Sequence, residues 1–237
     1  MSKYILSILI LTISVLVSSL LWGLANETTL PSLNPSVISR QFTSQEWQDL
    51  QKGEVLVFDN PENYSGGIGV ALINEPSWKI WQVITDYPKY PDFMPRSVQS
   101  KVLEISGNKV LIQNIFSSQW PFPKVRNTTW KIHYKENPNR LLITWKAEKT
   151  NLKTNFGFWS MEPYEENKTL LIYRVNFLIS WVPKPLVDIG AKDSIQDTMV
   201  AIIKRAKSER YDQYPNSFSM VWEDHSPKEA SNKKDHP

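Results

Sequence analysis

The chain has 237 residues, 41% of them hydrophobic, which is enough for one domain with a sizeable core and flanking segments. Its formal net charge is +3 and no Lys/Arg block is interleaved with aromatic residues, so we expect no nucleic-acid partner. The absence of cysteine excludes thiol catalysis, disulfides and Cys-ligated zinc, and two of the three histidines lie in the polar C-terminal tail, which argues against a His-based metal site.

The N-terminal segment is an export or membrane signal. Residues 4–24 are apolar or small and uncharged, and they follow a single lysine. A cleaved signal peptide has an apolar core of about 7 to 15 residues and a spanning helix needs about 20, so residues 1–25 form a signal peptide or a membrane anchor, and both alternatives stay open. We expect the folded part to be exported, either periplasmic or anchored to the membrane by this segment.

Residues 26–52 are predicted to be a linker that ends in a short helix over residues 44–52. The folded domain should then begin with a short strand over residues 53–58 and a β-branched and aliphatic strand over residues 68–73. A helix follows, with Pro76 in its first turn, where the missing N–H costs nothing. Pro88 ends that helix, and residues 89–94 leave room for one more short helix.

Alternating patterns dominate from residue 98 onward. Turn-forming residues separate the predicted strands 98–105, 109–117, 126–136, 140–147, 155–164 and 169–179. Such close spacing predicts an antiparallel meander with one continuous apolar face. In the third of these strands we expect Trp130 and Ile132 on the apolar face and His133 on the opposite side, as an ordinary solvent-facing residue beside two lysines. Arg174 should lie on the outer face, opposite Tyr173, as a solvated or ion-paired residue.

The longest helical pattern after the N-terminal segment covers residues 183–211. Its apolar residues Val187, Ala191, Ile195, Thr198, Ile202 and Ala206 recur at spacings of three or four and form one stripe. This stripe is the natural cover for the apolar face of the sheet. Residues 212–237 are rich in Ser, Lys, Asp and Pro and are predicted to be a disordered polar tail.

A family resemblance rests on the stretch from Trp81 to Pro95, Trp-Gln-Val-Ile-Thr-Asp-Tyr-Pro-Lys-Tyr-Pro-Asp-Phe-Met-Pro. It resembles the START-like (SRPBCC) superfamily, in particular its polyketide cyclase/dehydrase and coenzyme Q-binding branch, over about residues 53–210. The resemblance implies an α+β helix-grip fold, in which a curved antiparallel β-sheet wraps around a long C-terminal helix, with two short helices after the first main strand. The START-like domain should occupy residues 53–211. Asp86 is interpreted as part of the tight helix-to-helix corner.

No catalytic constellation is recognisable in the sequence. The carboxylates near turns and strand ends have no paired spacing that would tune one as an acid and another as a base, and no nucleotide-binding, zinc-protease or serine-hydrolase motif occurs. We therefore expect no catalysis, no cofactor and no metal.

An apolar sheet face under a long helix favours an apolar ligand, because burial of apolar area drives such binding. The residues expected to contact this ligand are Phe93, Met94, Trp130, Ile132, Trp145, Phe158, Tyr173, Phe177, Ile195 and Met199. The leading hypothesis is a monomeric protein that binds or carries a lipid, isoprenoid quinone or similar molecule outside the cytoplasmic membrane, with membrane contact. The alternative, which the resemblance permits, is an aromatase/cyclase-type enzyme acting on a polyketide-like substrate.

Overall fold

The computed structural model describes residues 42–60, 63–118, 123–136 and 140–213, all within the compact unit Arg40–Pro237. The predicted signal or anchor over residues 1–25, most of the linker, and the predicted tail beyond residue 213 lie outside the described residues. No helix in the described part is long and apolar enough to cross a membrane.

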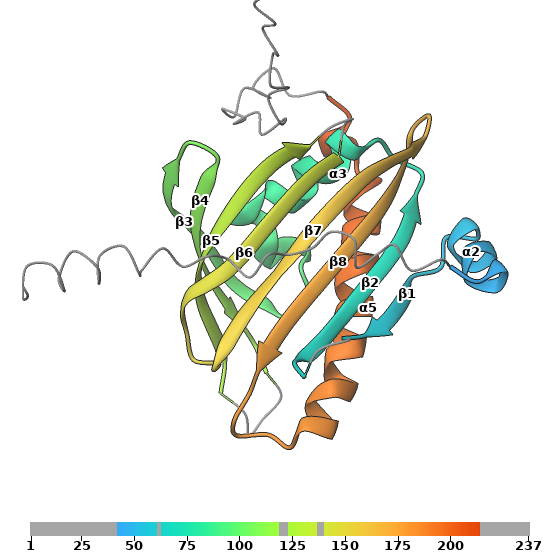
Figure 1. The fold of residues 1–237 in the computed structure, drawn as a ribbon. Coiled ribbons are helices and arrows are strands. Elements are labelled where there is room, and N and C mark those ends of the chain that lie inside the picture. The colour runs from blue at the N-terminus through green and yellow to red at the C-terminus, as the bar shows by residue number, and fades with distance from the viewer. Residues whose placement is uncertain (1–41, 61–62, 119–122, 137–139, 214–237) are drawn as a thin grey trace, which may run out of the picture. The chain divides into compact units, whose positions relative to one another are not determined.

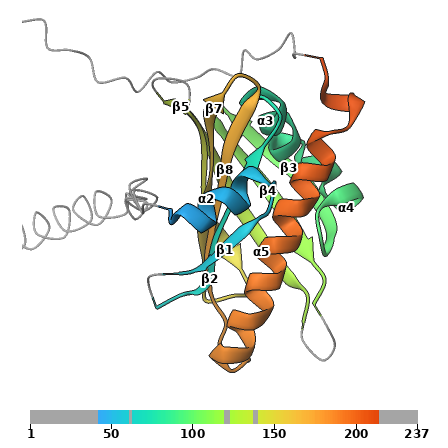
Figure 2. The ribbon, with the colours of Figure 1, turned by 90° about the vertical axis from the view of Figure 1, so that its right-hand side faces the viewer.

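The domain is a single antiparallel sheet with the long C-terminal helix and two short helices on one face, and a further short helix beside one edge (Figures 1 and 2). Its strands are β1 (Leu56–Asp59), β2 (Ser65–Ile73), β3 (Ser97–Ser106), β4 (Lys109–Phe116), β5 (Val125–Glu136), β6 (Arg140–Thr150), β7 (Thr154–Glu165) and β8 (Lys168–Leu178). The helices are α2 (Ser44–Gln51), α3 (Ser77–Thr85), α4 (Tyr90–Phe93) and α5 (Lys184–Ala206), with 3-10 turns η2 (Tyr87–Lys89) and η3 (Glu209–Tyr211). The sheet order is β1-β2-β8-β7-β6-β5-β4-β3, so the last strand of the meander returns to pair with β2. The helix-grip prediction is confirmed.

The sheet is curved by breaks in its register. Extra residues interrupt the pairing of β3 with β4, of β5 with β6 at Thr128/Thr129, and of β7 with β8 at Pro163/Glu165. A β-bulge bends its strand and increases the local twist, so these positions help the sheet to curl. Figure 2 shows α5 running along one face of the sheet, with α3 and α4 on the same side. We call this side the inner face and the opposite side the outer face.

The apolar stripe of α5 meets the inner face as predicted. Its buried residues are Ala191, Ile195, Met199, Ile202 and Ala206, and they join one core cluster with α3, α4 and the strands. The closest approach is to β2, where a Cβ at Gly69 would lie 2.8 Å from Ile195 Cγ2 and 3.0 Å from Met199 Cγ. Real Cβ atoms do not approach so closely, so the glycine is what lets the helix rest on the strand.

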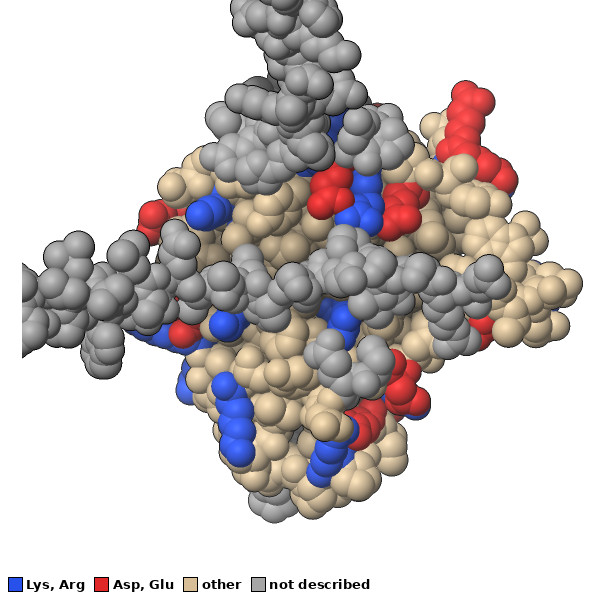
Figure 3. All heavy atoms as spheres, in the orientation of Figure 1, with Lys and Arg blue, Asp and Glu red and all other residues tan. Residues whose placement is uncertain are grey.

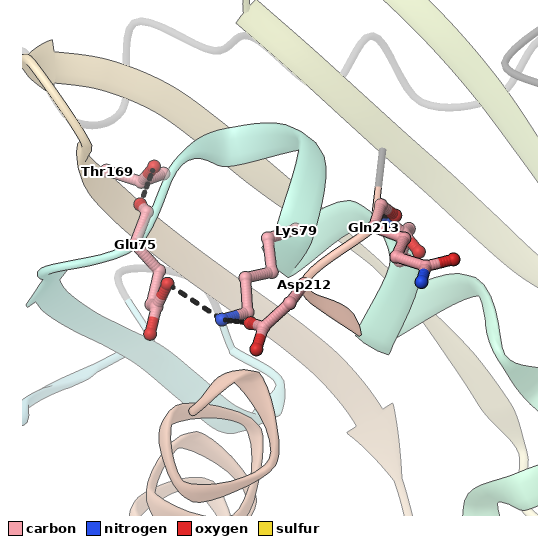
Figure 4. A network of polar contacts seen from close by, with 6 residues as sticks. Glu75, Lys79, Thr169, Asp212 and Gln213 are labelled. Carbon is pink, nitrogen blue, oxygen red and sulfur yellow. Dashed lines mark hydrogen bonds and ion pairs between the residues drawn. The ribbon is translucent and has the colours of Figure 1, made fainter. Parts of the chain in front are cut away.

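A network of polar contacts joins α3 to β8 and to the end of the described chain (Figure 4). The Lys79 ammonium lies 3.1 Å from Glu75 Oε2 and 2.5 Å from Asp212 Oδ1, while Thr169 Oγ1 donates to the Glu75 carbonyl at 2.8 Å. Burial lowers the pKa of Lys79, but hydrogen bonds to Asp212 and Glu75 outweigh it, so the pKa is raised overall. Lys79 thus stays charged and holds both carboxylates.

Replacing Gly69 tests the contact between α5 and β2. Gly69→Val would drive a branched side chain into Ile195 and Met199, and overpacking of this kind costs about 1–3 kcal/mol. We expect urea denaturation to show a lower midpoint for this variant. Gly190→Ala is the matched control, because nothing lies within 4 Å of a Cβ at that helical position. It should raise the free energy of unfolding by about 0.5–1 kcal/mol. An unchanged midpoint for Gly69→Val would contradict the packing.

Candidate functional site

Aromatic side chains cover the middle of the inner face. Tyr173 stacks on Trp159 with 4.0 Å between ring centroids and on Trp145 with 6.0 Å. Trp145 lies across Gly157, where a Cβ would come within 2.6 Å of its Cζ2 atom, and its indole N–H donates to Asn155 at 3.2 Å. The missing side chain at position 157 therefore makes room for the indole ring.

The four buried side chains of β5 are all polar. Asn127, Thr129, Lys131 and His133 alternate along the strand and are exposed by only 4%, 4%, 8% and 1%. Their cross-strand neighbours are mostly core residues, such as Ile112 on β4 and Ile143 and Trp145 on β6. We call these four residues the polar row. Buried polar groups are costly unless they are hydrogen-bonded, so each member needs its partners accounted for.

Lys131 has an aromatic neighbour but no polar one. Its Nζ lies 3.7 Å from the centroid of the Trp145 ring, a cation–π geometry. Among the residues that the structure describes, its ammonium has neither an ion-pair nor a hydrogen-bond partner. Burial lowers the pKa of Lys131 to about 7, from its ordinary value of 10.5. Near neutral pH this amine is therefore balanced between its charged and neutral forms.

His133 is a buried partner of Tyr87. The Tyr87 hydroxyl lies 2.7 Å from His133 Nε2, and the imidazole packs edge-on against Trp81 with 5.0 Å between centroids. Burial lowers the pKa of His133 to about 4, and the charge of Lys131 adds to the effect, so the ring is neutral at pH 7. Its Nδ1 atom has no hydrogen-bond partner in the described part of the chain. The expectation of a solvent-facing His133 was wrong.

The side chains of the Asp-Tyr-Pro corner, residues 86–88, make contacts on two sides. Asp86 Oδ2 accepts a hydrogen bond from the Tyr211 hydroxyl at 2.9 Å and lies 3.6 Å from the Arg210 guanidinium, which ties the corner to η3. Tyr87 turns inward to His133, and the Tyr90 hydroxyl donates to the Ile84 carbonyl at 2.5 Å. Burial raises the pKa of both tyrosines, so they stay protonated. These contacts agree with a structural role for Asp86.

Six of the ten residues predicted to contact a ligand lie in or against one core cluster, and a seventh shares the inner face. Trp145, Ile195 and Met199 belong to the core cluster, as does Met94, and Tyr173 and Phe93 pack against it partly buried. Phe177 follows Tyr173 at even spacing on β8 and is also partly buried. Their contact with a ligand stays a prediction.

Trp130, Ile132 and Phe158 lie on the outer face, so the expectation that they line the inner surface was wrong. Trp130 pairs with Lys146 and Ile132 with Thr144, and Phe158 pairs with Arg174, all outward positions. The physical reason is register: Lys131 is paired with Trp145, so both point inward and the neighbours of Lys131 on β5 must point outward. Sequence alternation identified the strand but assigned its faces the wrong way round.

Arg174 lies on the outer face, as its position opposite Tyr173 predicted, but it is not solvated. Only 3% of it is exposed, and its guanidinium donates to Asn60 Oδ1 at 3.1 Å and to Asn176 Oδ1 at 3.3 Å. It therefore takes no part in the inner surface. Charges of both signs are scattered over the side of the molecule in Figure 3, where grey atoms leave it visible.

The described residues hold no group of three or more His, Cys, Asp or Glu side chains arranged to bind a metal ion. The inner face offers one buried amine, one neutral imidazole, the Asn127 amide, the Thr129 hydroxyl and the tyrosine hydroxyls. These groups can donate or accept hydrogen bonds, and the amine can carry one positive charge.

The sequence matches the family described as polyketide cyclase / dehydrase and lipid transport over residues 73–202. The chain belongs to this family. The match begins at the last residue of β2 and ends within α5, so it contains both the polar row and the corner around Asp86. The family includes cyclases and lipid-transport proteins, and the coenzyme Q-binding assignment stays a prediction. No curated protein sequence matches the chain significantly.

Solved structures of the START superfamily have the same fold. The human StAR-related lipid transfer protein 5 superposes with a TM-score of 0.58 at 12% identity, covering 68% of this chain and 84% of that one. A STAR-related lipid transfer protein from Xanthomonas axonopodis gives a TM-score of 0.57 at 14% identity, covering 65% and 93%. The Zhui aromatase/cyclase from a Streptomyces species gives 0.47 at 14% identity, covering 68% and 97%. At these identities the likeness to the two lipid transfer proteins establishes the fold alone, and the weaker likeness to the aromatase/cyclase adds nothing to it.

Replacing Lys131 tests its burial. Between pH 7 and about 10 the unfolded chain binds a proton that the folded chain has released, so the wild-type free energy of unfolding should rise with pH over this range. Lys131→Met should remove that rise and, at pH 7, stabilise the ligand-free protein by about 1–3 kcal/mol, since an unpaired amine is no longer buried.

Chemical denaturation of delipidated protein at several pH values measures both effects. Lys146→Met, on the outer side next to Trp145, is the matched control and should change stability by less than about 0.5 kcal/mol. A destabilised Lys131→Met variant that keeps the wild-type pH profile would contradict the lowered pKa of the buried Lys131 amine.

Proposed function

We propose that the protein binds a hydrophobic small molecule, such as a lipid or isoprenoid quinone, between α5 and the inner face of the sheet, and that it acts as a carrier without catalysis. The observation that supports this most is the incomplete cover of the inner face. Tyr173, Val175 and Phe93 lie on this side but are only partly buried. Phe177, on the same side of β8, is also only partly buried.

The placement of α5 accounts for this incomplete cover. Among the strands, the helix packs mainly on β1 and β2, at one edge of the sheet, while α4 and η2 pack on β3 near the other edge. On the central strands the inner-face tryptophans of β6 and β7 are buried, but Tyr173 and Phe177 on β8 are not sealed completely. Burial of that surface by a ligand would contribute about 25 cal/mol per Å² of apolar area.

A cyclase-type enzyme remains the second candidate, because one observation favours it. The Tyr87–His133 pair and Lys131 place groups able to move a proton on the inner face, where sequence analysis expected none. A cyclase needs few such groups when its pocket orients the reactive chain. A carrier releases its ligand chemically unchanged, whereas an enzyme alters it, and this difference separates the two candidates.

We also propose that the protein is exported and collects its ligand at a membrane surface. Support for export comes from the apolar run of residues 4–24, which lies outside the described residues. Support for membrane contact comes from Trp181, Leu186 and Ile189 near the start of α5, which are 38%, 63% and 64% exposed. Exposed apolar side chains that cluster in this way are typical of interaction surfaces.

The direct experiment is native mass spectrometry, with organic extraction, of protein purified from its own envelope fraction. A co-purifying lipid or quinone near one molecule per chain supports the carrier. If the extracted molecule is recovered with a changed mass after incubation with the purified protein, the carrier function is wrong and the enzyme function is supported. Failure to bind any hydrophobic probe would overturn both.

Filling the inner face should block binding. Val175→Trp introduces an indole beside Tyr173 and should weaken binding of a fluorescent fatty-chain probe by at least about tenfold, since the apolar volume is taken by the protein itself. Leu170→Trp, on the outer side of the same strand, is the matched control and should bind as the wild type does. Equal binding by both variants would place the ligand elsewhere.

Removing the exposed apolar side chains should slow ligand exchange. We expect the double variant Leu186→Ser, Ile189→Ser to transfer a fluorescent lipid between vesicles several-fold more slowly, while equilibrium probe binding stays unchanged, because these side chains face away from the inner surface. Stopped-flow transfer assays measure the rate. A wild-type transfer rate in the double variant would exclude this surface as the membrane contact.

A further inference from the structure

The polar row on β5 is unusual for an inner strand of an apolar face. All four of its buried side chains are polar, although β6 beside it presents Leu141, Ile143 and Trp145. Asn127 accepts a hydrogen bond from Thr150 Oγ1 at 2.6 Å, and His133 binds Tyr87. Lys131, between them, has no polar partner among the described residues.

The ionisable groups around Lys131 supply no counter-charge. On its own strand His133 is neutral, because burial lowers its pKa to about 4. From η2, α4 and β8, Tyr87, Tyr90 and Tyr173 face the same side, and burial raises the pKa of each, which keeps them protonated and uncharged.

The nearby elements carry charges that are already engaged. Asp86 accepts from Tyr211, and Asp92 lies 3.8 Å from the Lys89 ammonium. On α5, the Arg205 guanidinium donates to the Tyr211 hydroxyl at 3.2 Å and stacks over the Phe93 ring. A buried amine without a counter-charge is costly to keep, and functional sites are where such costs are retained.

We propose that the ligand is an amphipathic anion, whose acidic head group pairs with the Lys131 ammonium while its apolar body lies along Trp145 and Tyr173. This inference rests on the proposed hydrophobic-ligand function and names the chemistry that the site selects. The head group is a carboxylate or a phosphate, since both give a charge-assisted hydrogen bond to an ammonium. The indole of Trp145 holds the ammonium from one side, and the anion approaches from another.

The proposal predicts a linkage between binding and protonation. The lowered pKa of Lys131 means that the ligand-free amine is only partly charged at pH 7, so an anion should draw the missing fraction of a proton into the site as it binds. Above pH 7 the free protein loses this proton, and affinity for the anion should fall about tenfold per pH unit. A neutral ligand of the same chain length should show no such dependence.

The experiment uses the delipidated full chain and three probes with the same alkyl chain: dodecanoic acid, dodecyl phosphate and dodecanol. Isothermal titration calorimetry at several pH values, in buffers of different ionisation enthalpy, gives affinity and proton uptake together. The wild type should bind at least one of the two anions about tenfold or more tightly than the alcohol at pH 7, with uptake of about half a proton at pH 7 that rises toward one as the pH is raised. Whichever anion binds more tightly identifies the head group as carboxylate or phosphate.

Two variants complete the test. Lys131→Met should bind acid, phosphate and alcohol with equal affinity and without proton uptake, while Lys146→Met on the outer side should behave as the wild type does. The proposal is overturned if the wild type binds both anions no more tightly than the alcohol, or if Lys131→Met keeps the preference for the anion. If no probe binds at all, including the alcohol, it is the proposed hydrophobic-ligand function that fails.

Discussion

The close approach of α5 to β2 decides how the rest of the inner face can be used. Gly69 has no side chain, and Ile195 and Met199 fill the space where one would stand. The helix is therefore held near the β1–β2 edge, and the short elements η2 and α4 reach the sheet from the β3 edge. Over the middle of the sheet the cover comes from α3, which packs on β7, and it leaves part of β8 uncovered. A surface suited to an apolar ligand thus follows from where the helix is seated, and not from a separate binding element.

The polar row on β5 makes this surface amphipathic. A purely apolar inner face would give a more stable protein, because burying Lys131 and leaving His133 Nδ1 unmatched both cost free energy. Aromatic neighbours reduce that cost through the cation–π contact with Trp145 and the edge-on packing of His133 against Trp81, but they cannot supply a counter-charge. Departures from the simplest stable solution concentrate where a protein functions.

Sequence patterns were sufficient for the elements and their order, because β-alternation, turn residues and the stripe on α5 are local signals. They failed for the faces of β5, because its more apolar side, with Trp130 and Ile132, faces outward, while its polar side, with Lys131 and His133, faces the core. One signal could have resolved it. The turn between β5 and β6 pairs Glu136 with Arg140, and this register carries Lys131 opposite Trp145. In this register Trp130 pairs with Lys146, so Trp130 and Trp145 cannot both point to the inner face, as the sequence analysis had assigned them.

The corner from Asp86 to Tyr90 explains why a short motif can specify so much of this fold. Two neighbouring side chains contact different parts of the domain. Asp86 accepts a hydrogen bond from the Tyr211 hydroxyl beyond α5, while the Tyr87 hydroxyl is hydrogen-bonded to the imidazole of His133 on β5. One turn of backbone therefore fixes the end of the gripping helix and the polar row at the same time. Pro88 and Pro91, in η2 and α4, restrict the backbone that separates these contacts. The motif that revealed the family is thus also the physical link between its C-terminal segment and the candidate binding surface.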